Sequence, residues 1–282
     1  METLLAIINE PKKAKSFIGY VAHLALDLHT NIHLMYVQEP YDYTLGQPPA
    51  KGLATSVKAQ KSNAEDAKKE IETHIKDVIG EISGEISINY STEIAYRTIL
   101  VNSYISDNKA SMIILEEEEQ ISFWSQTSNN IDIINHVNCP VWVIPFNADY
   151  KPFREIVYAT DYKEEDIETL KNLIGLTYRF SPVITALHIT DSVDFEEKVK
   201  KTGFNEMLQT KTGYQNITVK PLVEKDKESA AKLINEYALN IKADLIVVLR
   251  ENRNFFERIL SSDSTKKILK EAQLPVLVYQ YS

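Results

Sequence analysis

Ile156-Val157-Tyr158-Ala159-Thr160-Asp161 is the segment that decides the fold, because its pattern occurs twice in the chain. It is a short apolar run that ends at an acid, which is typical of a buried strand. The segment Leu4-Leu5-Ala6-Ile7-Ile8-Asn9 lies 152 residues earlier and has the same form, with an amide in place of the acid. The 282 residues are therefore expected to contain two related halves.

The same order of elements follows each of these two strands. Apolar residues at spacings of three and four predict an amphipathic helix after each one, within residues 14–28 and 167–177. Further strands are predicted in matching order in both halves: 33–37 and 185–189, 86–90 and 217–220, 112–115 and 245–249, and 140–144 and 275–279. Helix-forming stretches separate most of these strands, so both halves alternate between the two kinds of element.

This alternation predicts an α/β protein. Continuous apolar strands indicate parallel sheets that helices cover on both faces, so each half is expected to be a doubly wound, five-stranded, Rossmann-like domain. The polar stretch Asn147–Pro152 has no periodicity, which gives domains of residues 1–148 and 149–282. The insertion Glu39–Ser62 contains several glycines and prolines and is expected to be a surface loop.

Composition and charge exclude several classes of protein. A net charge of −9 and a pI near 5.3 argue against a protein that coats nucleic acid. No apolar run approaches the roughly 20 residues that span a bilayer, and the start of the chain predicts a strand rather than a signal peptide. The one cysteine, Cys139, permits no internal disulfide. A cytoplasmic protein fits these features best.

Two consecutive halves with this order of elements resemble a tandem universal stress protein. The resemblance rests on Ile156–Asp161, Ala243–Val248 and Ile268–Val278, and more loosely on Ile133–Val143. It covers nearly the whole chain and implies two Rossmann-like domains of the adenine nucleotide alpha hydrolase type. In this topology a ligand crevice is expected at the carboxyl ends of the first and fourth strands of a domain.

The resemblance also implies a class of the family that lacks the ATP loop. Members that bind ATP carry a glycine-rich loop after the fourth strand, where glycines let the main chain approach phosphate oxygens. The corresponding second-half loop, Arg250–Ser264, contains no glycine, and Ser262 and Asp263 hold the positions of the family's Gly-Ser. In the first half, Thr127 and Ser128 hold those positions.

The second half nevertheless keeps part of the family's ligand site. Asp161 matches the acid that ends the first strand, and several arginines in the loop after the fourth strand supply positive charge. An atypical anion or nucleotide site in this half would use the candidate residues Asp161, Ile189, Arg250, Arg253, Ser262 and Ser264.

The first half carries the whole excess of negative charge, with 11 Lys and Arg against 20 Asp and Glu in residues 1–150. The run Glu116–Glu119 follows the fourth strand, where phosphates would lie, and like charges repel there. We therefore predict that this domain does not bind ATP. The run could instead bind a divalent cation or a basic partner protein, but a solvated loop is the interpretation we favour.

The remaining candidate groups favour structural roles. The six histidines show no metal-ligand spacing, and Cys139 lacks a basic neighbour and is expected to be an inert core thiol. The aromatic pairs Phe123-Trp124 and Phe255-Phe256 are expected to fill space inside their loops, although a partner anchor is the alternative. No serine has the context of a hydrolase nucleophile.

Taken together, these features predict a non-catalytic, cytoplasmic stress-response protein without a cofactor or a metal. It would bind a protein partner that the sequence does not identify, or a small ligand in the second-domain cleft, and neither nucleic acid nor a membrane. In the family the closing strands pair across a dimer. The resemblance therefore implies that the two halves form an internal pseudo-dimer, in which Val141–Ile144 pairs with Val276–Tyr279. A further homodimer stays open. The alternative function is adenine-nucleotide binding with slow ATPase activity through the second domain.

Overall fold

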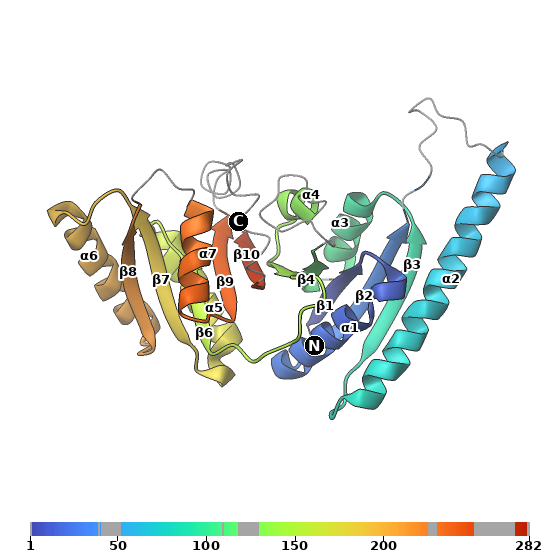
Figure 1. Cartoon of the computed structure of the whole chain (residues 1–282), viewed down its shortest axis with the longest axis horizontal. Helices are drawn as coiled ribbons and strands as arrows, with labels where there is room; N and C mark the ends of the chain where they lie inside the picture. Colours follow the sequence, from blue (N-terminus) through green and yellow to red (C-terminus); the bar gives the residue numbers. More distant parts are fainter. Residues whose placement is uncertain are drawn as a thin grey trace. The chain divides into compact units, whose positions relative to one another are not determined.

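The computed structural model describes residues 2–38, 40, 52–108, 110–117, 130–224, 230–250 and 274–280. These residues have an α/β fold with ten strands, and they form two compact units (Figure 1). Unit 1 takes in the described residues of Met1–Glu116, Asp132–Cys139 and Phe146–Tyr150. Unit 2 takes in those of Glu117–Ile131, Pro140–Pro145 and Lys151–Ser282. Within the described ranges, no helix combines the length and the apolar character that a membrane crossing requires.

Unit 1 contains four parallel strands in the order β3-β2-β1-β4. All four were predicted from their apolar runs, and the central strand β1 is buried along nearly its whole length. The bounds are β1 (Thr3–Ile8), β2 (Asn31–Gln38), β3 (Ile88–Ile94) and β4 (Ala110–Glu116).

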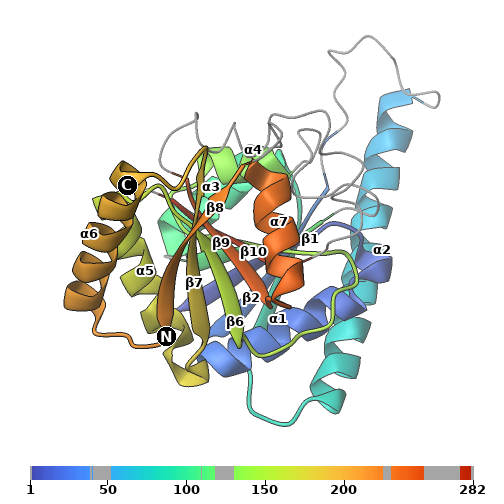
Figure 2. The same ribbon diagram turned by 60° about the vertical axis from the view of Figure 1, so that its left-hand side comes forward.

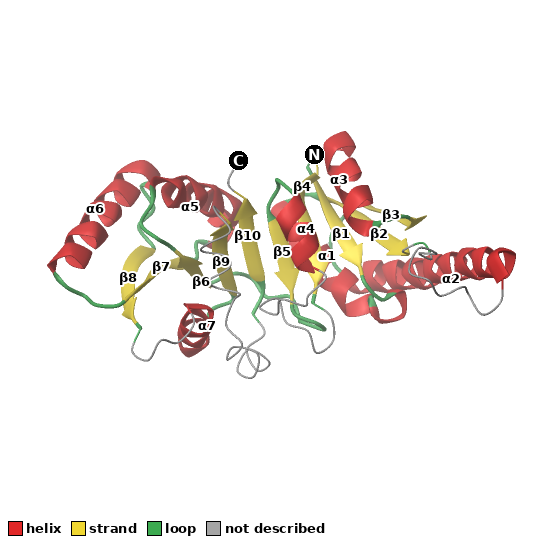
Figure 3. Cartoon of the chain, turned by 90° about the horizontal axis from the view of Figure 1, so that it is seen from above, coloured by secondary structure: helices red, strands yellow, loops and turns green. Residues whose placement is uncertain are grey.

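Helices cover both faces of the unit 1 sheet, as the doubly wound prediction requires. Figure 3 shows α1 (Lys15–Leu28) and α2 (Gly52–Glu81) on one face and α3 (Arg97–Asn108) on the other. Helix α1 buries the apolar stripe that its spacing predicted, and it ends at His29, whose φ of 53° is left-handed.

The start of α2 corrects one prediction. The insertion expected to be a loop as far as Ser62 is helical from Gly52 onward. No glycine or proline occurs between Leu53 and Ile79, and alanine, lysine and glutamate are frequent there. These residues lose little side-chain freedom in a helix, so the chain becomes helical as soon as the glycine and proline cluster ends.

Unit 2 contains six strands in the order β5-β10-β9-β6-β7-β8. All neighbours are parallel except β5 and β10, which pair antiparallel with Leu277 opposite Trp142. The two strands predicted to close the halves therefore pair with each other. The bounds are β5 (Val141–Ile144), β6 (Glu155–Ala159), β7 (Val183–Thr190), β8 (Ile217–Val223), β9 (Leu245–Arg250) and β10 (Val276–Gln280).

Helices also cover both faces of the unit 2 sheet. Figure 2 shows α7 (Ala230–Asn240) in front of the strands, and Figure 3 places α5 (Glu164–Thr177) and α6 (Phe195–Thr212) on the opposite face. Helix α6 begins after Asp194, whose side chain accepts a hydrogen bond from the backbone N–H of Glu197 at 2.9 Å. A further helix, α4 (Asn130–His136), precedes β5 in the chain. This arrangement brings the carboxyl ends of β6, β7 and β9 to one edge of the sheet.

Candidate functional site

The loop after β6 is built around one buried carboxylate. Asp166, in the first turn of α5, is only 4% exposed and accepts hydrogen bonds from four donors. The Tyr158 hydroxyl donates at 2.7 Å and the Thr160 hydroxyl at 2.8 Å. The backbone N–H groups of Asp161 and Lys163 donate at 3.0 and 3.1 Å. Because Asp166 holds the backbone on both sides of this turn, the backbone position of Asp161 is fixed.

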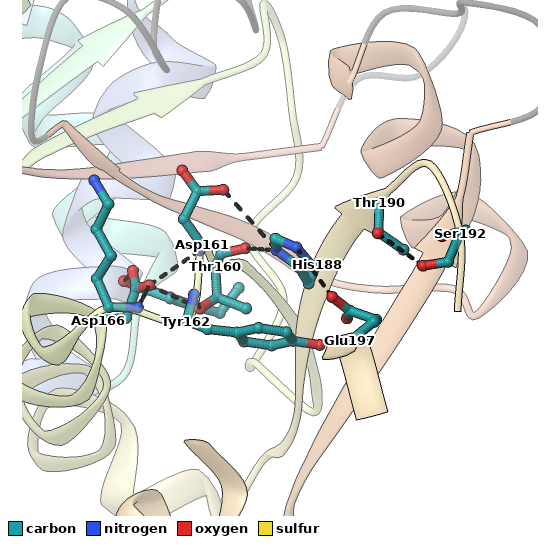
Figure 4. Close-up of polar contacts among 10 residues, drawn as sticks. Thr160, Asp161, Tyr162, Asp166, His188, Thr190, Ser192 and Glu197 are labelled. Carbon is teal, nitrogen blue, oxygen red and sulfur yellow. Dashed lines mark hydrogen bonds and ion pairs between the residues drawn. The ribbon is translucent and has the colours of Figure 1, made fainter. Parts of the chain in front are cut away.

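Asp161 lies beside a histidine near the end of the neighbouring strand β7 (Figure 4). His188 Nδ1 is 2.8 Å from the carbonyl oxygen of Thr160, and since a carbonyl only accepts, this nitrogen donates. The same nitrogen is 3.9 Å from Asp161 Oδ1. The Asp161 side chain remains 34% exposed, so it is available to solvent and to a ligand.

A second carboxylate and a tyrosine complete the surroundings of His188. Glu197 Oε2 lies 3.9 Å from His188 Nε2, on the side opposite Asp161, and Glu197 is buried. The Tyr162 ring packs on the imidazole with 4.2 Å between centroids and on Phe204 at 5.2 Å. Burial, followed by the nearby charge of Glu197, raises the pKa of Tyr162 above its ordinary value. His188 is thus held between two carboxylates and against an un-ionised phenol.

Three of the six predicted ligand residues lie at this edge. Asp161 follows β6, Ile189 is the penultimate residue of β7, and Arg250 ends β9. Because β6 pairs with both β7 and β9, the topology brings their carboxyl ends together. Arg250 Nη1 donates to Gln280 Oε1 at 3.0 Å. The other three candidates, Arg253, Ser262 and Ser264, lie outside the described residues.

Sequence reasoning missed His188, Tyr162 and Glu197 as parts of this edge. One signal for His188 was present in the predicted strands. In the observed register Ala159 faces Leu187, so the next residue of each strand, Thr160 and His188, also lie side by side. Glu197 could not be found in this way, because its place depends on how α6 packs.

The corresponding edge of unit 1 is occupied by its own side chains. Asn9 takes the place of the acid, and its Nδ2 donates to the carbonyl oxygen of Glu116 at 2.8 Å. Its Oδ1 accepts a hydrogen bond from Arg97 Nη2 at 2.7 Å. The amide is therefore satisfied on both sides by protein atoms.

Burial of the acidic run corrects a second prediction. Glu116 and Glu117 are 5% and 6% exposed, so the solvated-loop interpretation is wrong for both, while Glu118 and Glu119 lie outside the described residues. Burial raises the pKa of Glu116 to about 7, although the N–H of Asn147 donates to it at 3.4 Å and opposes the rise. Glu116 closes β4 and its side chain is inside the fold, so near neutral pH it carries only part of a charge.

Cys139 is half-buried rather than part of the core. Burial raises the pKa of its thiol to about 11, so the thiol stays protonated near neutral pH and is a poor nucleophile, as predicted. In the part of the chain that the structure covers, no three histidine, cysteine or acidic residues form a group that could hold a metal ion. The aromatic pairs Phe123-Trp124 and Phe255-Phe256 lie outside that part.

Comparison with known proteins identifies similarity in sequence for the second half. Residues 152–280 match the Universal stress protein family. A universal stress protein of Methanocaldococcus jannaschii is 28% identical over 138 residues, which are 45% of this chain and 81% of that protein.

Solved structures show similarity of fold over the whole chain. A universal stress protein from Archaeoglobus fulgidus matches with a TM-score of 0.70 at 12% identity, covering 99% of this chain and 98% of that one. A protein of unknown function from Pseudomonas aeruginosa matches with a TM-score of 0.54 at 14% identity, covering 99% and 92%. The chain thus shares the fold of the Archaeoglobus fulgidus universal stress protein, and its residues 152–280 are similar in sequence to that family.

Proposed function

We propose that the chain is a tandem universal stress protein that acts in a stress response by binding a protein partner or a small ligand and that catalyses no reaction. The observation that carries this proposal is that Asn9, at the edge of unit 1, is held by other protein groups. Where ATP-binding members have an acid, Asn9 is hydrogen-bonded to Arg97 and to the Glu116 backbone. A nucleotide would have to break both bonds and lie against the buried Glu116 side chain.

The edge of unit 2 is the better place for a small ligand. Asp161 is partly exposed and its backbone is fixed by Asp166, so a ligand would meet a carboxylate that is already in position. The loop Arg250–Ser264 contains no glycine, which does not favour a triphosphate there. A ligand with hydrogen-bond donors, rather than a polyphosphate, suits this edge.

The antiparallel pairing of β5 with β10 supports the internal pseudo-dimer as part of the proposal. These strands end the two sequence repeats, so their pairing takes the place of the contact that the family resemblance implies between two chains. The burial of Glu116 and Glu117 removes both from any surface that a basic partner would meet. A cytoplasmic location is part of the proposal and rests on the resemblance and the single cysteine.

Calorimetric titration of the full chain with ATP and Mg²⁺ tests the proposal. We expect no saturable heat for the wild type at millimolar ATP. Asp161→Ala is the site variant and Asp191→Ala, at an exposed position after β7, is its matched control. The proposal of a protein that does not bind nucleotide would be overturned if ATP bound saturably to the wild type and to Asp191→Ala but not to Asp161→Ala.

The second candidate function is adenine-nucleotide binding with slow ATPase activity in unit 2. It is favoured by one observation: a partly exposed acid after β6 and an arginine at the end of β9 lie at the same edge. This function predicts release of phosphate from ATP that depends on Asp161. A phosphate-release assay on the wild type and the two aspartate variants separates it from the first candidate.

A further inference from the structure

Unit 1 contains a cavity of about 630 Å³ that the proposed function does not use. It lies between the first half of α1, the end of α2 and the segment 147–150. Its size is within the range of small-molecule sites, which is roughly 300–1,000 Å³. None of its lining residues belongs to the unit 2 edge.

One side of the cavity is formed by the ring of Tyr150, which several contacts hold in place. The Tyr150 hydroxyl donates a hydrogen bond to Asp27. Its ring meets the buried Tyr20 edge-on at 5.3 Å between centroids and lies parallel to His23 at 5.8 Å with an interplanar angle of 11°. A ring fixed in this way offers a planar ligand a surface for stacking without the loss of side-chain freedom on binding.

The hollow lies over a glycine in the middle of α1. A Cβ built on Gly19 would meet only one atom within 4 Å, Val78 Cγ2, and that contact would be 4.0 Å long. Val78 is buried and Ile82 also lines the cavity, so the lining beside Gly19 is apolar. The missing side chain therefore leaves apolar surface open where a ligand can lie.

The charges around the cavity cancel. Lys13 and Lys15 line it together with Glu81 and Asp149, which gives two side chains of each sign. Lys15 Nζ is 2.7 Å from Glu81 Oε1, so these two charges already pair with each other. Neither an anion nor a cation gains a net attraction here, whereas an uncharged ligand displaces no ion pair.

We propose that this cavity is a binding site for a small, uncharged, planar aromatic molecule that stacks on the Tyr150 ring above Gly19. The site goes beyond the proposed function, because it lies in unit 1 and does not involve Asp161. Indole is a suitable probe, since it is planar, uncharged and has one N–H donor. Cyclohexanol is its non-planar counterpart of similar size.

The test is a titration of the ¹⁵N-labelled full chain with indole, followed by NMR. For the wild type we expect saturable shifts of the Gly19 and Tyr150 amide signals. Gly19→Leu fills the hollow and should weaken binding at least tenfold. Gly175→Leu is the matched control, because Gly175 lies in α5 with nothing near its missing Cβ, and it should bind like the wild type. Both changes replace glycine by a better helix former, so both variants are expected to fold.

The outcomes decide the proposal in either direction. Three results together support the site: Gly19→Leu abolishes indole binding, Gly175→Leu preserves it, and the affinity of the wild type is the same at low and high salt. Absence of saturable shifts in the wild type overturns it, and so does equal binding to Gly19→Leu. Cyclohexanol binding as tight as indole also overturns it, because a non-planar molecule cannot stack on the ring, and a strong salt dependence contradicts an uncharged ligand.

Discussion

At the scale of residues, two buried carboxyl groups have opposite roles. Asp166 has four hydrogen-bond donors and organises the turn that carries Asp161. Glu116 accepts a long hydrogen bond from the backbone N–H of Asn147, yet burial raises its pKa to about 7. A buried carboxylate is stable only where donors replace the lost water, so the first group is expected to stabilise the fold and the second to weaken it when ionised.

Replacement of Asp166 by alanine tests the first role. The change leaves four donors without their acceptor, two of them backbone N–H groups, and should lower the free energy of unfolding by about 3 kcal/mol. Urea denaturation measures this loss. The exposed Asp191→Ala should stay within about 0.5 kcal/mol of the wild type. A loss below about 1 kcal/mol for Asp166→Ala would contradict its role as the organising group.

Replacement of Glu116 by glutamine tests the second role. The pKa rises from an ordinary 4.5 to about 7 on folding, so the folded state binds the proton more tightly than the unfolded state. The protonated Glu116 makes its full contribution to the free energy of unfolding below pH 4.5. This contribution, about 3 kcal/mol, is lost as the pH rises to about 7. Glu116→Gln should therefore be more stable than the wild type at pH 8. The difference should shrink towards pH 5, and thermal unfolding across this range measures it.

At the scale of elements, the ten described strands could be predicted from the sequence. Most are continuous apolar runs such as Ile113–Leu115, which are buried on both faces of a sheet, while β3 and β8 are β-leaning runs that are only partly buried. The start of α2 could not be predicted, since the glycines and prolines just before Gly52 indicate a loop. The cluster around His188 was also missed, because its members come from β7, the loop after β6 and the first turn of α6, and only packing brings them together. Burial of Glu116 was missed because four consecutive acids indicate solvent, whereas the strand continues to the first of them.

The pairing of β5 with β10 gives a prediction at this scale. Trp142, in β5, is fully buried, lies opposite Leu277 and packs on Phe153 with 5.0 Å between ring centroids. Trp142→Ala should lower the free energy of unfolding by about 3–5 kcal/mol, because it leaves a large cavity beside this strand pair. Chemical denaturation measures the loss, with the exposed Tyr178→Ala as control. Near-equal stability of the two variants would show that the pair contributes little to the fold.

At the scale of the whole molecule, corresponding positions of the two halves of the sequence have different surroundings. The 152-residue offset relates Asn9 to Asp161, yet Asn9 is locked by Arg97 while Asp161 remains partly exposed. The fold of a universal stress protein from Archaeoglobus fulgidus extends over the whole chain, and residues 152–280 match the family in sequence.

The measurement that tests the central claim most directly is the adenine-nucleotide content of the full chain, purified after incubation with ATP and Mg²⁺, denatured and assayed by ion-pair chromatography. The hydrogen-bonded Asn9 in unit 1 and the glycine-free sequences that follow the fourth strand of each half predict far less than one molecule of nucleotide per chain, with Asp161→Ala indistinguishable from the wild type. Recovery of about one molecule of ATP or ADP per chain, reduced in Asp161→Ala, would contradict a binding protein that works without nucleotide.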